Sequence, residues 1–191
     1  MDESIEEDKV VLRGRGKGVW RRGFLNHFAA DVNGGTTTLW VSGGSGAFRK
    51  NIWEKIGGLN ELYNPFYWED IDLSYKAQKA GYKVLFEKRS IVQHLHEEGS
   101  IKKNYSSYNV QKTAYRNQFF FTWLNATDTM LLVTHLFFLP YALLQAVKRK
   151  DRAFIVGFLH ALFLLPRVLR EREKVQRLVQ KSDKQVIHQL A

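Results

Sequence analysis

The chain contains no cysteine. Without thiols it can form neither a disulfide framework nor a thiolate metal site, and this composition fits a reducing cytosol. We also expect no secretory signal, because residues 1–8 are acidic and contain few apolar side chains. The sequence therefore predicts a cytoplasmic protein that is held together by its core.

The composition is that of a folded protein with an unevenly placed basic charge. Hydrophobic residues make up 45% and aromatic residues 14% of the 191 residues, enough for one domain, or for a small domain with an appendage. The net charge is +10, and the stretch from Lys148 onward holds eleven Lys and Arg against four Asp and Glu. Such a stretch points to an anionic membrane surface or to nucleic acid. Because the charge accompanies apolar helices without an exposed aromatic platform, we expect a membrane surface and no nucleic acid.

Residues 1–23 form the first of three predicted regions. Residues 1–8 are an acidic, solvated lead, and residues 9–23 are basic and rich in glycine. The Arg-Gly-Arg-Gly-Lys-Gly run at 13–18 could bind a phosphate or RNA, or could be a surface loop. Because no helix pattern follows the glycines, we predict a loop.

Residues 24–116 form the second region, in which short strands and helices alternate. The β-branched and apolar residues at 36–41 predict a strand, whereas 24–35 shows no clear pattern. Apolar or small residues at helical spacing, followed in each case by glycine, predict helices at 49–56 and 70–80. The remaining elements expected here are strands at 82–86 and 91–96 and a loop at 101–116 that leads into a helix.

Three carboxylates, Glu69, Asp70 and Asp72, cluster where the second of these helices begins. The free N–H groups and the positive dipole end at a helix N-terminus stabilise negative charge, so these side chains are expected to stay ionised. An ionised and rigid Asp70 suits a general base, and Glu69 or Asp70 could equally serve only as a helix cap. Asp72 is expected to be a structural residue of the first turn.

Two further groups of residues have both a functional and a structural interpretation. His94 and His96 are two residues apart on a predicted strand and therefore share a face. They could bind a divalent metal with carboxylates from elsewhere, or form a surface pair. Gly43, Gly44 and Ser45 belong to a run of small residues that lets the backbone approach a ligand closely, or that turns a tight corner.

The order of these pieces is informative. A Gly-Ala-Phe-Arg-Lys sequence, a short helix, Gly-Gly, Glu-Asp-Ile-Asp-Leu and a histidine motif follow one another between residues 46 and 96. In this order the chain resembles the C-terminal half of the catalytic domain of family 2 glycosyltransferases of the rhamnosyltransferase-like kind, over roughly residues 10–125. The resemblance implies an α/β fold, namely a partial GT-A-like nucleotide-diphospho-sugar transferase half with a C-terminal apolar and basic helical extension.

The resemblance also implies roles for the residues singled out above. Asp70 would be the catalytic base that deprotonates the acceptor hydroxyl, and Glu69 would hold it or contact the acceptor. His94, with His96 as the alternative ligand, would complete the coordination of Mg²⁺ or Mn²⁺ on the donor diphosphate. The implied substrate-binding residues are Gly43, Gly44 and Ser45 at the junction of donor sugar and acceptor, and Trp68 on the acceptor side.

The implied reaction is inverting transfer of a sugar, rhamnosyl or another hexosyl, from a nucleotide sugar to a glycan or lipid-linked acceptor of the cell envelope. The nucleotide-binding half of the family, with its Asp-x-Asp pair, is not found before Asp70. We therefore expect a fragment of such an enzyme that is weak or inactive alone, with the donor bound by a separate polypeptide. The alternative is a non-catalytic, membrane-associated interaction module derived from such an enzyme.

Residues 117–191 form the third region, which we expect to be helical. Two apolar runs, 129–147 and 153–166, precede a charged tail at 167–191. The first run is just long enough to cross a bilayer, which takes about 20 residues, although Pro140 lies inside it. A spanning helix or hairpin, an amphipathic pair at the interface and ordinary core helices remain open. Basic residues flank both runs, so we predict contact with the inner face of the cell membrane.

Overall fold

The structure is a computed structural model that describes residues 2–6, 9–93 and 100–188. Its strands are β1 (Asp2–Glu6), β2 (Lys9–Arg13), β3 (Gly16–Arg21), β4 (Phe24–Ala29) and β5 (Val92–Gln93). Its helices are α1 (Lys50–Ile56), the short 3-10 helix η1 (Glu61–Tyr63), α2 (Glu69–Lys79), α3 (Ser100–Asn104), α4 (Ser107–Asn125), α5 (Thr129–Lys148), α6 (Arg152–Phe163), α7 (Leu165–Gln176) and α8 (Asp183–His188).

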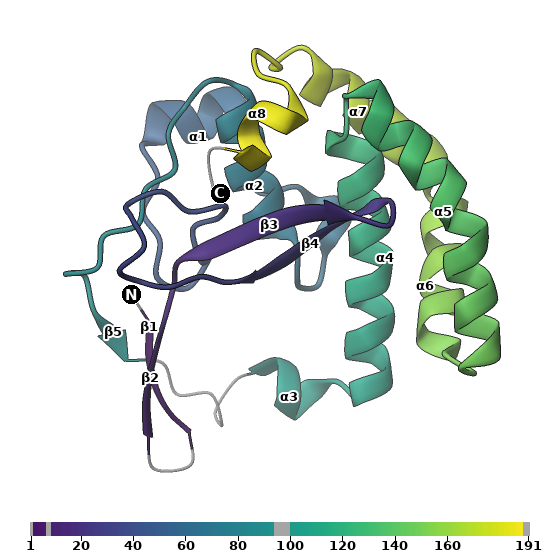
Figure 1. The fold of residues 1–191 in the computed structure, drawn as a ribbon, viewed down its shortest axis with the longest axis horizontal. Helices are drawn as coiled ribbons and strands as arrows, with labels where there is room; N and C mark the ends of the chain where they lie inside the picture. The colour runs from purple at the N-terminus through teal and green to yellow at the C-terminus, as the bar shows by residue number, and fades with distance from the viewer. Residues whose placement is uncertain (1, 7–8, 94–99, 189–191) are drawn as a thin grey trace.

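The fold is mixed α/β, with helices predominating (Figure 1). Its sheets are small: β2-β1-β5 has three strands, and the β3–β4 hairpin has two. The predicted α/β class is confirmed at this level. The more specific expectation, a GT-A-like transferase half, stays a prediction.

Both helices predicted for the second region are confirmed. α1 is followed by Gly57 and Gly58, whose φ angles of 84° and 61° lie in the left-handed region that glycine adopts at helix ends. α2 begins at Glu69, so all three predicted carboxylates lie in its first turn. Local periodicity and glycine stops were therefore sufficient to predict these two elements.

The strands predicted at 36–41 and 82–86 are wrong. The two segments share only an isolated antiparallel bridge between Thr37 and Leu85. The physical reason is that side chains supply hydrogen-bond partners which a neighbouring strand would otherwise provide. Gln78 of α2, for example, donates to a backbone carbonyl of the first segment at 2.8 Å.

Strands also occur where loops were expected. Residues 9–23 contain β2 and β3, and the acidic lead at 1–8 contains β1. The Val-Val-Leu run at 10–12 favours a strand despite the glycines that follow it. β5 pairs in parallel with β1 and covers only part of the strand predicted at 91–96, of which 94–96 lie outside the described residues.

The β3–β4 hairpin packs against α5. Its turn consists of Arg22 and Gly23, whose φ angles of 52° and 82° are typical of a type I′ turn. A Cβ atom at Gly23 would lie 2.7 Å from the Cα of His135 in α5, so only glycine allows this close approach. Trp20 adds a hydrogen bond from its Nε1 to the Oγ1 of Thr134 at 3.0 Å. The hairpin is thereby fixed to the N-terminal half of α5.

Helices α4 to α7 occupy one side of the molecule, opposite β1, β2 and β5 (Figure 1). α4 is continuous, so the predicted boundary between 116 and 117 falls inside a helix, and the loop predicted at 101–116 is largely helical. α6 packs closely on α4, because a Cβ at Gly157 would lie 2.9 Å from the carbonyl oxygen of Lys112. The helical character predicted for 117–191 is confirmed for the described residues.

α4 also carries the centre of the aromatic core. Phe119 packs edge-to-face on Phe24 of β4, with ring centroids 5.3 Å apart, and on Phe154 of α6 at 5.5 Å. Phe121, on another side of the helix, packs on Trp68 at 5.1 Å. The hairpin, α6 and the turn before α2 therefore all rest on the same helix.

A buried carboxylate holds α8 in place. The Oδ1 of Asp183 accepts hydrogen bonds from Lys79 Nζ at 2.7 Å and from the Tyr75 hydroxyl at 2.8 Å, both in α2. Its Oδ2 accepts the backbone N–H groups of Thr127 at 2.6 Å and Asp128 at 2.7 Å. Burial alone would raise the pKa of Asp183, but the bonds from Lys79 and the backbone outweigh it and lower this pKa below its usual value. Asp183 thus joins three separate parts of the chain.

Asp183→Ala is expected to lower the free energy of unfolding by about 3–5 kcal/mol, because the buried ammonium of Lys79 loses its counter-charge. Urea unfolding at neutral pH, followed by circular dichroism, measures this loss. Lys174→Ala is the control: it removes a largely exposed ion pair with Glu171 at 2.8 Å and should change stability by less than about 1 kcal/mol. A loss for Asp183→Ala as small as that of the control would contradict the proposed role of Asp183.

Candidate active site

The turn before α2 has an unusual backbone conformation. Tyr67 and Trp68 have φ angles of 71° and 76°, in the left-handed region that residues other than glycine rarely adopt. The side-chain amide of Asn117, on α4, donates to the carbonyl oxygens of Tyr63, Phe66 and Tyr67, each at 2.8 Å. These bonds hold a strained turn in place, and strain of this kind is typical of functional sites.

Asp70 is half-buried in the first turn of α2. Its Oδ1 accepts the backbone N–H of Ile71 at 2.8 Å, and the backbone of Gly43 lies next to it. Burial raises the pKa of Asp70 above its ordinary value of 3.8, and the N–H groups of Ile71 and Gly43 offset only part of this effect. Burial therefore outweighs the helix N-terminus, and the carboxylate is a stronger base than an exposed aspartate.

Glu69 is adjacent to Asp70 but has different surroundings. Its Oε2 is buried and has no hydrogen-bond partner among the described residues. Burial raises the pKa of Glu69, and the neighbouring charge of Asp70 adds to the shift. The side chain lines a hollow of about 230 Å³ whose other walls come from the segment between α1 and α2. A buried oxygen without a partner can accept a hydrogen bond from a ligand hydroxyl.

Asp72 contrasts with these two carboxylates. It is fully buried, and its Oδ1 accepts hydrogen bonds from the Tyr63 hydroxyl at 3.0 Å and from Asn125 Nδ2 at 2.7 Å. Its Oδ2 lies 2.9 Å from the Nζ of Lys76. These contacts join α2 to η1 and α4, which is the structural role expected for Asp72.

The glycine–serine segment begins along one face of α2. Residues 39, 41 and 43 each contact one residue of α2, and these helix residues are four positions apart. Four helix residues rise about 6 Å and two residues of chain can span at most about 7 Å, so the segment is long enough to follow the helix in these steps. The contacting pairs are Leu39 with Gln78, Val41 with Ser74 and Gly43 with Asp70.

The three small residues predicted to bind substrate differ in their surroundings. Gly43 lies against the Asp70 side chain, whereas no atom lies within 4 Å of a Cβ built on Gly44. Ser45 lines a hollow of about 120 Å³ together with Trp40. The structure therefore brings Gly43 to the carboxylates, leaves Gly44 facing open space and directs Ser45 to a separate hollow.

Trp68 is part of an aromatic group next to the carboxylates. Only 6% of Trp68 is exposed, so little of its ring is available to a ligand. His27 of β4 meets the Trp68 ring edge-to-face at 4.9 Å and the half-exposed ring of Trp40 at 5.4 Å. Burial by these rings lowers the pKa of His27, although part of its surface remains exposed. His27 and Trp40 are the accessible members of the group.

His94 and His96, the predicted metal ligands, lie outside the described residues. Within the described ranges, no group of three or more His, Asp or Glu side chains comes together to hold a metal ion. The carboxylates of α2 therefore do not make a Mg²⁺ or Mn²⁺ site with other described residues.

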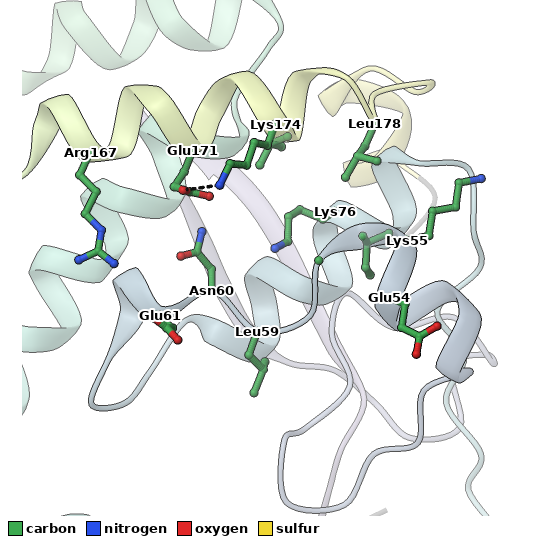
Figure 2. A pocket seen from close by; sticks show the side chains of 13 residues that line it. Glu54, Lys55, Leu59, Asn60, Glu61, Lys76, Arg167, Glu171, Lys174 and Leu178 are labelled. Carbon is green, nitrogen blue, oxygen red and sulfur yellow. Dashed lines mark hydrogen bonds and ion pairs between the residues drawn. The ribbon is translucent and has the colours of Figure 1, made fainter.

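A larger hollow of about 490 Å³ lies between α7 and the segment that joins α1 to η1 (Figure 2). Figure 2 shows Arg167, Glu171 and Lys174 on α7 above this space, with Lys76 on its floor. Glu171 and Lys174 pair with each other, and Lys76 already pairs with Asp72. Because charges of both signs line the hollow, its lining gives no preference for a charged ligand.

Comparison with known proteins adds no assignment. No family model matches the chain, and no curated protein is significantly similar to it. The functional interpretation therefore depends on the residues and the geometry described above.

Sequence reasoning missed three residues of this site: His27, Trp40 and Asn117. His27 lies in a stretch without clear periodicity, and Trp40 was assigned to a strand. Asn117 acts on carbonyl groups that are at least 50 positions away in the chain. A buried side-chain amide needs hydrogen-bond partners. The position of Asn117 next to a run of phenylalanines could therefore have indicated that it binds other parts of the chain.

At neutral pH, Asp70→Asn is expected to raise the free energy of unfolding, because burial opposes the charge of Asp70 in the folded protein. As the pH falls through the raised folded-state pKa, protonation stabilises the wild-type protein. The difference from the variant should then disappear below the ordinary value of 3.8. Urea unfolding across this pH range measures both effects.

Asp72→Asn is the matched control on the same helix. It leaves the buried Lys76 without a counter-charge and should lower the free energy of unfolding by about 3–5 kcal/mol. If Asp70→Asn also destabilises the protein at neutral pH, Asp70 is a structural cap and not a base whose pKa is raised by burial.

Proposed function

We propose that this chain carries the acceptor side and the general base of an inverting glycosyltransferase that uses a nucleotide sugar. The observation that carries the proposal is the half-buried Asp70 carboxylate, whose pKa is raised by burial. It lies beside Glu69 and Gly43 at the end of a strained turn. The order of the sequence motifs supports the same assignment.

Asp70 suits this role because its contacts are backbone N–H groups, and no described cation forms an ion pair with it. In the proposed step it takes the proton of the acceptor hydroxyl while that oxygen bonds to the anomeric carbon of the donor. The bond from this carbon to the diphosphate oxygen breaks, and the nucleoside diphosphate leaves with the electron pair. Attack opposite the leaving group inverts the anomeric centre. A raised pKa favours this proton transfer near neutral pH.

Neighbouring groups are proposed to position the acceptor. The unpartnered Oε2 of Glu69 accepts a hydrogen bond from a second acceptor hydroxyl. Trp40 and His27 offer an aromatic surface on which the apolar face of a sugar ring packs. Trp68 has an indirect role, because its buried ring packs against His27 and holds it in place.

Donor binding is proposed to involve groups beyond the described residues. His94, with His96 as the alternative, is the proposed ligand of Mg²⁺ or Mn²⁺, and a separate donor-binding polypeptide is the proposed source of the nucleotide contacts. The proposed acceptor is a glycan or lipid-linked glycan of the cell envelope, met at the inner face of the membrane.

A second candidate function is a non-catalytic, membrane-associated interaction module. The exposed apolar residues of α5 and α6 favour it, and it requires no donor site. The two candidates differ in the role of Asp70, because the module would keep its function in an Asp70→Asn variant.

A glycan-binding screen tests the acceptor side without a donor. The full chain is applied to an array of glycans and alkyl glycosides, and the affinities of its hits are measured by calorimetry. Trp40→Ala is expected to weaken binding by about tenfold, because a large aromatic contact is lost. Asp70→Asn should bind normally. No binding to any glycan, or an equal loss for Trp53→Ala in α1, which is not part of the proposed acceptor site, would contradict the proposal.

A transfer assay tests the base. The chain is incubated with radiolabelled UDP- or dTDP-sugars, Mn²⁺ and a membrane extract that supplies acceptor and donor-binding polypeptide; alone it should give little turnover. Asp70→Asn is expected to lower the rate by about 10²–10⁴-fold, the range for loss of a positioned base. Asp31→Asn, which changes an exposed carboxylate, is the control. A wild-type rate for Asp70→Asn rules out the assignment of the base.

A further inference from the structure

The outer face of α5 exposes a stripe of apolar side chains. Phe137 is 75% exposed and Met130 is 71% exposed. By length and composition, α5 could also cross a membrane. Because the exposed residues recur every three or four positions, they lie on one face of the helix. They include Val133, Leu136, Phe137, Leu144 and Val147. Met130 and Tyr141 are also exposed but lie beside the β3–β4 hairpin.

α6 carries a second stripe beside the first. Phe163 is 81% exposed and Leu159 is 55% exposed, whereas Ala153 and Gly157 on the opposite face are buried. α5 and α6 lie next to each other at the edge of the molecule (Figure 1). Large apolar side chains exposed on two neighbouring helices mark an interaction surface.

The inner face of α5, in contrast, is bound to the rest of the protein. The buried His135 accepts a hydrogen bond at Nε2 from Trp123 Nε1 at 3.0 Å. The proton of this neutral ring is therefore on Nδ1, which donates to the carbonyl of Gly23 at 2.8 Å. Trp20 binds the neighbouring Thr134. α5 thus has one bound face and one free face.

Basic residues adjoin the free face. Lys148, Arg149, Lys150 and Arg152 are exposed where α5 joins α6. The one acidic residue among them, Asp151, caps α6 through the N–H of the third residue after it. α5 and α6 contain no Asp or Glu. An anionic lipid surface complements this combination of apolar stripe and positive charge, whereas a second copy of this surface offers no acidic partner.

The β3–β4 hairpin indicates the orientation of α5. Gly23 abuts His135, and the guanidinium of Arg22 lies 5.9 Å from the centroid of the Tyr141 ring. If α5 crossed the bilayer, the exposed Arg21 and Arg22 would lie at the depth of the hydrocarbon core, where charge is unfavourable. If α5 lies parallel to the surface, the same arginines can remain in water or among the headgroups.

We infer that α5 and α6 lie in the plane of an anionic membrane surface. Their free faces enter the boundary of the acyl chains, and the turn at 149–151 lies among the headgroups. This inference selects the interfacial arrangement from the three that the sequence left open. It does not depend on the proposed glycosyl transfer, because it uses no residue of the candidate active site.

Vesicle flotation tests the apolar part of the inference. The double variant Phe137→Glu, Leu144→Glu is expected to bind vesicles of equal parts phosphatidylglycerol and phosphatidylcholine at least about tenfold more weakly. The control is Leu85→Glu, Ile91→Glu, which changes two side chains that are each 59% exposed on another part of the molecule. Circular dichroism verifies the fold of both variants. Equal binding by the two double variants overturns the inference.

The charge variants test the anionic requirement. Changing Lys148, Arg149 and Lys150 to Gln is expected to weaken binding to the same vesicles by about a hundredfold. High salt should have a similar effect. The control changes three exposed lysines far from this surface, Lys50, Lys83 and Lys88, to Gln. An equal loss in the control would show that net charge alone drives binding.

Because the protein has no cysteine, single cysteines can carry an environment-sensitive dye and report depth. Met130→Cys and Val147→Cys place dyes about 25 Å apart along α5, close to the thickness of a bilayer core. An in-plane helix gives equal shallow depths at both positions and at Phe137→Cys, and a soluble quencher outside the vesicles reaches all three. A deeper dye at 137, with quenching of only one end, would show that α5 spans.

Light scattering without vesicles tests a second copy as the alternative partner. The wild-type chain is expected to be monomeric at micromolar concentration in a mild detergent. A dimer that Phe137→Glu dissociates would show that another copy covers the surface, and would overturn the membrane assignment.

Discussion

Buried charge on α2 is the constraint on which the rest of the structure depends. Asp72, Lys76 and Lys79 lie on buried faces of this one helix, and a buried charge without a partner destabilises a protein by several kcal/mol. Asp72 and Lys76 pair with each other. Further partners come from other segments: η1 and α4 for Asp72, Gly58 after α1 for Lys76, and α8 for Lys79. Satisfying these three charges therefore decides where those segments lie, and the turn that presents the candidate active site is positioned as a consequence.

The first turn of α2 contains two kinds of carboxylate, which differ in their surroundings. Asp72 has a cation beside it and serves the fold. Among the described residues, Asp70 contacts backbone N–H groups and the Oε2 of Glu69 has no hydrogen-bond partner, and burial raises the pKa of both carboxyls. The sequence shows that the carboxylates gather at a helix start, but not which of them a distant residue neutralises. Stabilisation by the helix N-terminus alone would lower the pKa of these two carboxyls, whereas burial by segments elsewhere in the chain raises it.

The parts of the fold that the sequence predicts are those with local causes. α1 and α2 follow from apolar spacing and the glycines after them. The strand expected at 36–41 fails because Gln78 and Ser74, far along the chain, bind the backbone of this region. The aromatic group and the hydrogen bonds of the Asn117 amide likewise depend on residues far apart in the chain, so no local sequence pattern predicts them. The order of motifs nevertheless places Asp70 and Gly43 together, as the structure does.

The contacts between residues 39–43 and α2 fix the length of this segment. Because contacts recur at every second residue on one side and every fourth on the other, substitutions can leave the alignment intact, but a change in length cannot. One inserted or deleted residue would move the backbone groups of this segment out of register with the helix and would displace the buried Leu39. Gly44 has open space around it and no such constraint. We therefore expect a change in length to be tolerated only after Gly43, where it leaves the distance from the aromatic group to Asp70 unchanged.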